Sequence, residues 1–362
     1  MKKFIFIALI SILQAKSNYD FSGKIGFEME SIKNPGASNK FFNGDGSILF
    51  GVTAKIKKEL VYGFGIGAEI GALIEGNDKF NKTKELTELS QLYLAYKYKN
   101  TTLKMGRFEL SEDISPLTWS ERTASVIDVS YNGIVIVNQD LPDTTIATAW
   151  IKSYTEDAGS TKIGENGLFM FGATKKLTKD STINITGYYT KNFIDNNNYL
   201  SVWSSLITNI SGIDFGAQVA YAKIQNKKAT LAAATFISKN FNNIEATLTL
   251  AYINNGKASI NPIGSNAFWG DSLDGIFGSD IDASKGKQKI VRLDLGYEFT
   301  NQTRIYGGVA ANKVDLGSTE IAAQAGYEFK VANIDMVAQY SFLKDNNKQK
   351  SHSIKIEGVY RF

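Results

Sequence analysis

A two-residue alternation of apolar and polar side chains runs through almost the whole chain, and it constrains the fold more than any other feature. The segment Ser47–Lys57 illustrates it, with Ile48, Phe50, Val52, Ala54 and Ile56 set against Ser47, Thr53, Lys55 and Lys57. A period of two puts these sets on opposite faces of a β-strand. The sequence therefore predicts an all-β protein whose strands each carry one apolar and one polar face.

The alternation recurs, interrupted by turns, up to the final residue. The clearest segments are Tyr19–Ser31, Ser47–Lys57, Val61–Leu73, Gln91–Tyr98, Leu103–Phe108, Ile183–Thr190, Ile213–Tyr221, Ala229–Ile237, Ile244–Tyr252, Val291–Phe299, Ile305–Ala311, Glu320–Phe329, Ile334–Phe342 and Ile354–Phe362. Weaker ones lie near Val126–Ile136, Thr145–Ile151, Leu168–Ala173 and Leu200–Ile207. Together they predict about 18 strands, with about 16 as the alternative, which are common sizes for outer-membrane barrels.

The polar faces decide between a soluble β-sandwich and a membrane barrel. Most segments carry Lys, Glu, Asp, Arg or Gln on the polar face, and a sandwich would have to bury those groups in its core at prohibitive cost. A closed barrel instead places the apolar face against lipid and the polar face in a wet lumen, with every backbone group paired inside the sheet. We therefore predict a transmembrane antiparallel β-barrel.

The connections alternate between short turns, such as Lys99–Asn100 and Thr178–Asp180, and longer polar segments. The longer ones are Ile32–Asp45, Glu75–Glu88, Ser111–Thr123, Tyr154–Glu165 and Asn254–Gly286. Outer-membrane barrels have short periplasmic turns and long extracellular loops. We expect the same orientation here, with both ends of the barrel on the periplasmic side.

The first residues have the composition of a secretory signal peptide. Lys2 and Lys3 precede the apolar run Phe4–Leu13, and such a run is too short to span a bilayer as a helix. We place cleavage after Ala15, with Ser17 as the alternative, which divides the chain into a signal peptide, residues 1–15, and one barrel domain, residues 16–362. The chain has no Cys, so neither disulfides nor thiolate metal sites hold it together.

The last segment carries a candidate signal for assembly in the outer membrane. Ile354, Ile356, Tyr360 and the final Phe362 share one face of the predicted strand. An alternating strand that ends in aromatic–x–Phe resembles the signal that the outer-membrane insertion machinery reads. We therefore predict Tyr360 and Phe362 as the insertion signal, that machinery as a partner, and outer-membrane lipids and lipopolysaccharide as the surroundings of the barrel.

The selectivity of a wide barrel is set at its narrowest point by charged side chains. The best candidate for a loop that narrows the lumen is Ser111–Thr123, because it follows an early strand and carries Glu112, Asp113, Glu121 and Arg122. Basic residues with lumen phase are expected to face it, namely Lys24, Lys55, Lys97, Lys104 and Arg292. Opposed acidic and basic walls would create a transverse field across the pore. The alternative is that Glu112, Asp113 and Glu121 belong to a solvated outer loop.

These features predict a passive porin for small hydrophilic solutes and ions. Acids and bases of the lumen are nearly balanced, which predicts weak ion selectivity with a mild cation preference. Two alternatives stay open: a substrate-specific channel, for amino acids or sugars for example, and an adhesin or structural barrel.

We expect no enzymatic activity, because the only His is His352 and it has no partners that would make it a catalytic base. The net charge of +4, or +2 without Lys2 and Lys3 (4 − 2), argues against a nucleic-acid partner.

Short segments carry a resemblance to a known family. SQLYLAY (Ser90–Tyr96), MGRFEL (Met105–Leu110) and the acidic SEDISPLTWSERT (Ser111–Thr123) are similar to the campylobacterial major outer-membrane porins, which are related to the Opr-type porins. GSDI (Gly278–Ile281) resembles another part of that family. The resemblance implies a barrel of about eighteen strands, a homotrimer that admits small hydrophilic solutes, and in some members a calcium ion at the constriction.

Calcium is the one cofactor for which the sequence offers a candidate site. Four acidic residues crowd the longest connection, namely Asp271, Asp274, Asp280 and Asp282, and oxygen-rich loops can bind Ca²⁺. Their spacing does not match an EF-hand, and acidic loops are often simply solvated. The prediction is therefore that no cofactor is required, with calcium as the alternative.

Overall fold

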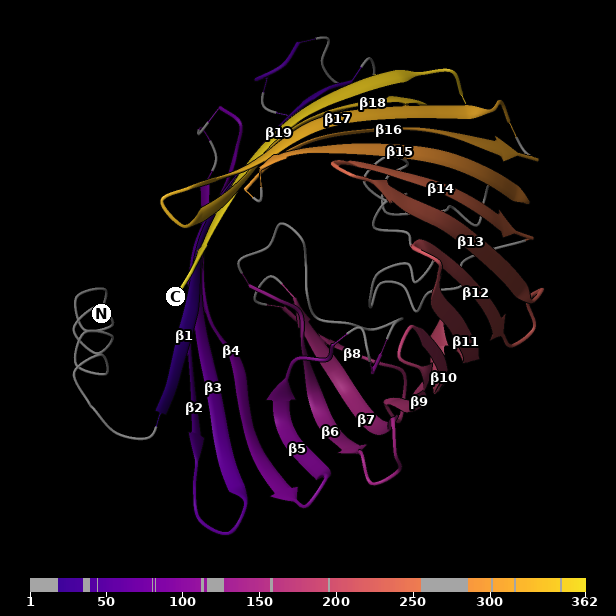
Figure 1. The fold of residues 1–362 in the computed structure, drawn as a ribbon. Helices are drawn as coiled ribbons and strands as arrows, with labels where there is room; N and C mark the ends of the chain where they lie inside the picture. The colour runs from indigo at the N-terminus through magenta and orange to yellow at the C-terminus, as the bar shows by residue number, and fades with distance from the viewer. Residues whose placement is uncertain are drawn as a thin grey trace.

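The computed structural model describes residues 19–34, 40–43, 45–79, 81, 83–111, 114–115, 127–156, 159–194, 196–254, 286–300, 302–315, 317–345 and 347–362. None of these residues belongs to a helix long and apolar enough to cross a membrane. They form one antiparallel sheet (Figure 1) with the strands β1 (Tyr19–Lys33), β2 (Ser47–Glu59), β3 (Phe64–Asn77), β4 (Thr83–Tyr98), β5 (Thr101–Phe108), β6 (Ser130–Asn138), β7 (Thr144–Glu156), β8 (Gly159–Lys162), β9 (Leu168–Thr178), β10 (Ser181–Ile194), β11 (Asn197–Ile210), β12 (Ile213–Ile224), β13 (Thr230–Phe241), β14 (Ile244–Ile253), β15 (Gln288–Thr300), β16 (Thr303–Val314), β17 (Glu320–Val331), β18 (Ile334–Lys344) and β19 (Lys350–Arg361).

The sheet closes on itself, because β1 pairs with β2 on one side and with β19 on the other. Among the described residues, β8 pairs only with β7, whereas β7 also pairs directly with β9. The short β8 therefore lies beside the ring, and the closed barrel in Figure 1 has 18 strands (19 − 1). The prediction of an all-β antiparallel barrel of about 18 strands is confirmed.

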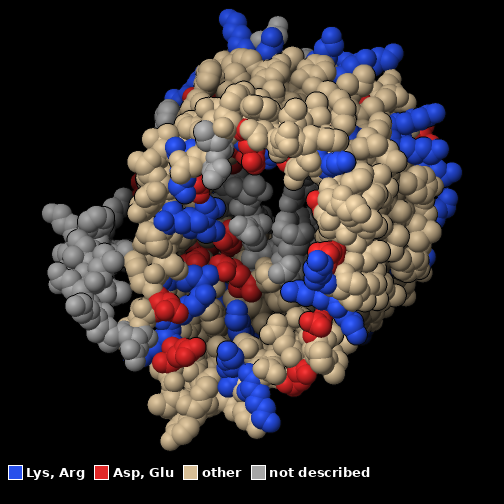
Figure 2. All heavy atoms as spheres, viewed as in Figure 1, with Lys and Arg blue, Asp and Glu red and all other residues tan. Residues whose placement is uncertain are grey.

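The two faces of the sheet differ as the alternation predicts. Large apolar side chains are exposed on the outer face all around the barrel, for example Phe50 on β2, Leu250 on β14 and Val309 on β16, which are 50%, 46% and 55% exposed. Figure 2 shows charged side chains around the hollow of the barrel and mostly uncharged atoms over much of its flank. Such an outer surface suits lipid, and the inner one suits water.

The seam between the first and last strands involves the chain's final residue. The backbone N–H of Gly23 donates to a backbone oxygen of Phe362 at 2.9 Å, and the N–H of Phe362 donates to the carbonyl oxygen of Gly23 at 3.1 Å. The ring of Phe362 lies 5.7 Å from that of Phe21 and 6.1 Å from that of Tyr360. The two aromatic residues predicted as an insertion signal thus lie on the outer face where the barrel closes.

Tight hairpin turns join strands at one rim. Ser211 and Gly212 have φ angles of 53° and 78°, and Ala332 and Asn333 have φ angles of 48° and 68°. Two successive positive φ values are typical of the type I′ turn, whose twist matches that of the paired strands. The connections between β5 and β6 and between β14 and β15 lie at the opposite rim, as expected for an outer-membrane barrel.

Several strands extend further than the alternation indicates. The segment Glu75–Glu88, predicted as a long loop, instead contains the end of β3 and the beginning of β4, with a register shift between Glu69 and Ile70. The predicted strand Val126–Ile136 begins only at Ser130. Thr83–Ser90 reads as polar because a strand that continues past the lipid band does not need an apolar outer face.

Apolar side chains fill part of the lumen between β4 and β11. Tyr93, Phe108, Tyr131, Tyr188 and Tyr199 are each at most 6% exposed and belong to one cluster of buried residues. Leu110, which follows β5, packs into the same cluster. Because this apolar cluster occupies the lumen beside β4–β11, the polar cavity described below lies against β1–β5.

Candidate functional site

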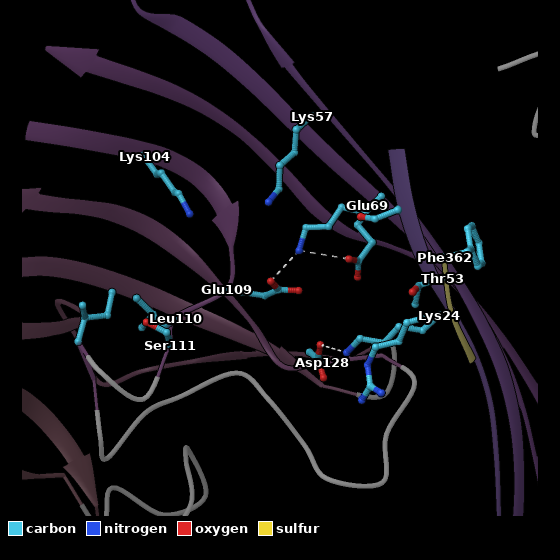
Figure 3. A pocket seen from close by; sticks show the side chains of 15 residues that line it. Lys24, Thr53, Lys57, Glu69, Lys104, Glu109, Leu110, Ser111, Asp128 and Phe362 are labelled. Carbon is cyan, nitrogen blue, oxygen red and sulfur yellow. Dashed lines mark hydrogen bonds and ion pairs between the residues drawn. The ribbon is translucent and has the colours of Figure 1, made fainter. Parts of the chain in front are cut away.

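The candidate site is a cavity of about 520 Å³ on the lumen side of β1–β5 (Figure 3). The wall strands contribute Lys24 from β1, Lys55 and Lys57 from β2, Glu69 from β3 and Lys104 from β5. The two ends of the connection between β5 and β6 contribute Glu109 and Asp128, and the last strand contributes Arg361. The cavity is thus lined by five cationic and three carboxylate side chains.

Lys55 lies at the centre of the charged network. Its Nζ is 2.7 Å from Oε2 of Glu109 and 3.5 Å from Oε2 of Glu69. Gln91 donates to Glu69 at 3.0 Å and also to Glu109, and the Ser90 hydroxyl donates to Glu69 at 2.8 Å. Buried carboxylates need such donors to offset their lost hydration. The network therefore fixes Glu109, just after β5, to the wall formed by β2–β4.

A second ion pair holds the other end of the same connection. Nζ of Lys24 on β1 is 2.6 Å from Oδ2 of Asp128, which precedes β6. Because Glu109 is held by Lys55 and Asp128 by Lys24, both ends of the connection are tied to one wall of the lumen (Figure 3). The chain between them consequently starts and finishes inside the barrel.

Two lysines of the cavity have no carboxylate partner among the described residues. Lys57 and Lys104 point into the cavity in Figure 3, and no ion pair joins either of them to a described carboxylate. Nζ of Lys104 lies 5.2 Å from the centre of the Tyr93 ring, within cation–π range. Tyr93 is the cross-strand partner of Gly67, and a Cβ at Gly67 would lie 2.6 Å from the ring atom Cε1, so only glycine leaves room for this ring.

The structure brings together three of the residues predicted for the constriction. Lys24, Lys55 and Lys104 line the same cavity. Lys97 lies near the end of β4, is exposed and does not line it. Arg292 lies on β15, is 3% exposed and donates to both carboxylate oxygens of Asp294 at 2.5 Å. The remaining predicted residues lie outside the described residues, namely Glu112, Asp113, Glu121 and Arg122.

Sequence reasoning missed the partners that organise the cavity. Glu109 follows the segment Leu103–Phe108, and Asp128 lies in the weak segment Val126–Ile136, so the pattern assigned neither of them to the lumen. Lys57 has the same phase as Lys55, and this signal would have identified it. Among the described residues no group of three or more His, Cys, Asp or Glu side chains could hold a metal ion. The acidic residues considered for calcium, Asp271 to Asp282, are not described.

Comparisons with known proteins relate the chain to porins through structure rather than sequence. No sequence profile of a known protein family matches it, and no curated protein matches it significantly. Pseudomonas aeruginosa OpdQ superposes with a TM-score of 0.75 at 11% identity, covering 96% of this chain and 99% of its own. A BenF-like porin from Pseudomonas fluorescens Pf-5 gives 0.74 at 11% identity and covers 96% and 99%. The outer membrane protein OpdK of P. aeruginosa gives 0.73 at 9%, covering 95% and 98%. At these identities the likeness establishes a shared barrel fold.

Proposed function

We propose that this protein is a porin of a bacterial outer membrane, a passive diffusion channel for small hydrophilic solutes and ions. The observation that carries the proposal is the closed 18-stranded ring with an apolar outer face and a charged cavity in its lumen. Its likeness to porin structures over nearly the full length of both chains supports it. A structural barrel or adhesin would not need ion-paired side chains around an inner cavity.

Reconstitution of the purified barrel tests this proposal. We expect stepwise conductance increases in planar bilayers, and swelling of liposomes in small neutral and charged solutes with rates that fall as solute size rises. A folded protein, shown by heat-modifiable migration on a gel, that gives neither conductance nor swelling would contradict the porin proposal. It would favour the adhesin or structural alternative.

A second candidate is a channel selective for small carboxylates. The specific observation in its favour is the pair Lys57 and Lys104, which face the cavity without a described carboxylate partner. Lys104 also lies over the ring of Tyr93. OpdK, which has a similar fold, has been crystallised with vanillate, an aromatic carboxylate. A local excess of cationic side chains favours anions, which differs from the mild cation preference expected from the overall balance of charges.

A salt-gradient measurement separates the two candidates. A general pore gives a reversal potential near zero and solute flux that rises linearly with concentration. A carboxylate channel gives an anion-selective reversal potential, and its benzoate flux saturates while glucose flux does not.

The remaining expectations complete the proposed function. The segments Ser90–Tyr96 and Met105–Leu110 support a relationship to the campylobacterial and Opr-type porins, and that relationship supports a homotrimer. We propose that residues 1–15 direct export and that Tyr360 and Phe362 present the barrel to the insertion machinery. No enzymatic activity and no required cofactor are part of this proposal, with calcium in the connection Asn254–Gly286 kept as the alternative.

A further inference from the structure

Four lysines on the outer face, Lys289, Lys313, Lys344 and Lys350, form what we name the rim patch. They lie at the ends of β15, β16, β18 and β19 that are opposite the short turns. Lys289 and Lys313 have the phase of the exposed residues Val291 and Val309, so they point away from the lumen. Lys and Arg side chains gather on the outer edge of the barrel where β14 and β16 end (Figures 1 and 2).

The patch places like charges directly opposite each other. Lys289 pairs in register with Lys313 across β15 and β16, and Lys344 pairs with Lys350 across β18 and β19. Directly opposed side chains have Cβ atoms about 5 Å apart, and like charges at that spacing are destabilising. No described carboxylate forms an ion pair with any of the four. Asp345 instead accepts from the backbone N–H groups of Asn347 and Gln349.

The patch lies where the apolar band of the barrel ends. Lys289 is the cross-strand partner of the exposed Tyr252, and Lys344 is the partner of the exposed Ile321. Tyr340, four residues before Lys344 on the same face, is 44% exposed. Exposed tyrosines mark the level at which the hydrocarbon meets the headgroups. The ammonium groups of the patch therefore lie at headgroup level, above the long-connection end of the band.

Three other lysines on the outer face, Lys58, Lys239 and Lys191, have local side-chain partners. At the short-turn rim, Lys58 donates to the hydroxyl of Tyr19 at 2.9 Å, and Lys239 lies 5.0 Å from the centre of the Phe241 ring. At the same rim as the patch, Lys191 is 3.5 Å from Glu165. The rim patch differs from these residues because its lysines lie directly opposite one another in register and have no described carboxylate between them.

We propose that the rim patch binds the phosphate groups of an outer-leaflet lipid headgroup. Phosphate between two opposed lysines offsets their repulsion, and basic side chains near the membrane surface attract anionic lipid headgroups. The acyl chains of the same lipid then lie along the apolar band below, against residues such as Val291 and Val309. This inference rests on the proposed outer-membrane location, and it concerns the outer surface rather than the pore.

Native mass spectrometry of the full chain in detergent tests the proposal. The probes are lipid A with two phosphates, its dephosphorylated counterpart and inorganic phosphate. The test variant replaces all four lysines (K289Q, K313Q, K344Q and K350Q), and the control replaces Lys58 and Lys239 in the same way. We expect lipid A to be retained by the parent protein and by the control, and to bind the fourfold variant at least ten times more weakly.

Each other outcome overturns the proposal. Equal retention of lipid A by the fourfold variant would mean that the patch does not bind it, and equal retention of the dephosphorylated lipid would mean that phosphate is not recognised. Displacement of lipid A by millimolar inorganic phosphate would indicate a site for the free ion. If the fourfold variant does not fold, K289Q/K313Q and K344Q/K350Q are measured separately by the same criteria. Conductance of the same samples tests the porin proposal independently.

Discussion

The lumen has two charged walls that use their ion pairs differently. On the wall formed by β14–β19, each described inward-facing cation has a carboxylate partner on the sheet. Arg292 has Asp294, Arg304 has Glu245 and Glu328, Lys330 and Arg361 have Asp335, and Lys355 has Glu28 and Glu357. On the wall formed by β1–β5, Lys24 and Lys55 are paired with Asp128 and Glu109, which lie outside the strands. Lys57 and Lys104 are left without a described carboxylate.

The difference separates two uses of charge in one barrel. Pairs formed within the sheet neutralise a wall and stabilise it, since each cation is matched by a nearby acid. Pairs formed with Glu109 and Asp128 tie the two ends of a connection to the lumen wall, and that wall keeps an excess of positive side chains. We therefore expect substitutions on β14–β19 to affect stability, and substitutions on β1–β5 to affect solute selection.

The largest expected effect is on stability, from Asp294→Asn. Arg292 is 3% exposed and makes two hydrogen bonds to Asp294, and removal of one partner from such a buried pair costs about 3 kcal/mol. Urea titration of the reconstituted barrel, followed by heat-modifiable migration, measures the loss. The matched control is Asp335→Asn, whose partners Lys330 and Arg361 are well exposed, with an expected loss below about 1 kcal/mol. Equal losses in the two variants would mean that burial of the cation does not set the contribution of an ion pair on this wall.

The next largest effect is expected on ion selectivity, from the double variant K57E/K104E, which reverses the two cavity charges that have no described carboxylate partner. Unit charges about 4 Å apart interact by about 1 kcal/mol in water, and a difference of about 1.4 kcal/mol is a factor of ten. We therefore expect the ratio of anion to cation permeability to fall about tenfold, while conductance at high salt changes little. The reversal potential under a salt gradient measures the ratio. Lys97→Glu is the control, because Lys97 does not line the cavity, and an equal shift in that variant would argue against a local effect.

The alternation made the faces of the strands predictable, and with them the barrel, its strand number and the lumen phase of Lys24, Lys55 and Lys104. It could not predict their partners. Which acid meets Lys55 depends on the register of β2 and β3 and on the path of the chain after Phe108, whereas the alternation reports only local backbone geometry. Arg292 has the predicted phase, but Asp294 on the same strand holds its side chain. Strand ends such as Thr83–Ser90 were missed because neither face there needs to be apolar.

A matched pair of glycines sharpens the comparison at a smaller scale. Gly67 on one wall faces the Tyr93 ring, and Gly326 on the other faces the ring of Tyr306. An added Cβ would lie 2.6 Å from Cε1 of Tyr93 in G67A and 2.5 Å from Cε1 of Tyr306 in G326A. We expect both variants to lose about 1 kcal/mol of stability from overpacking. Only G67A should also lower anion preference, because Tyr93 contacts Lys104. Salt-gradient potentials of both variants measure this, and a shift in G326A alone would contradict it.

The smallest expected effect comes from Glu109→Gln, which removes one negative charge from the cavity and keeps the shape of the side chain. Lys55 then retains only Glu69, at 3.5 Å, as its carboxylate partner, so the excess of positive charge grows by one unit. One charge near Lys55 contributes less than about 1 kcal/mol in a hydrated cavity, which predicts about a twofold rise in the ratio of anion to cation permeability. Because Glu109 also ties the connection to the wall, single-channel records should show more current noise. Glu328→Gln is the matched control, since Arg304 keeps Glu245 at 2.6 Å. An unchanged permeability ratio and unchanged noise in E109Q would mean that this ion pair neither balances the cavity nor holds the connection beside it.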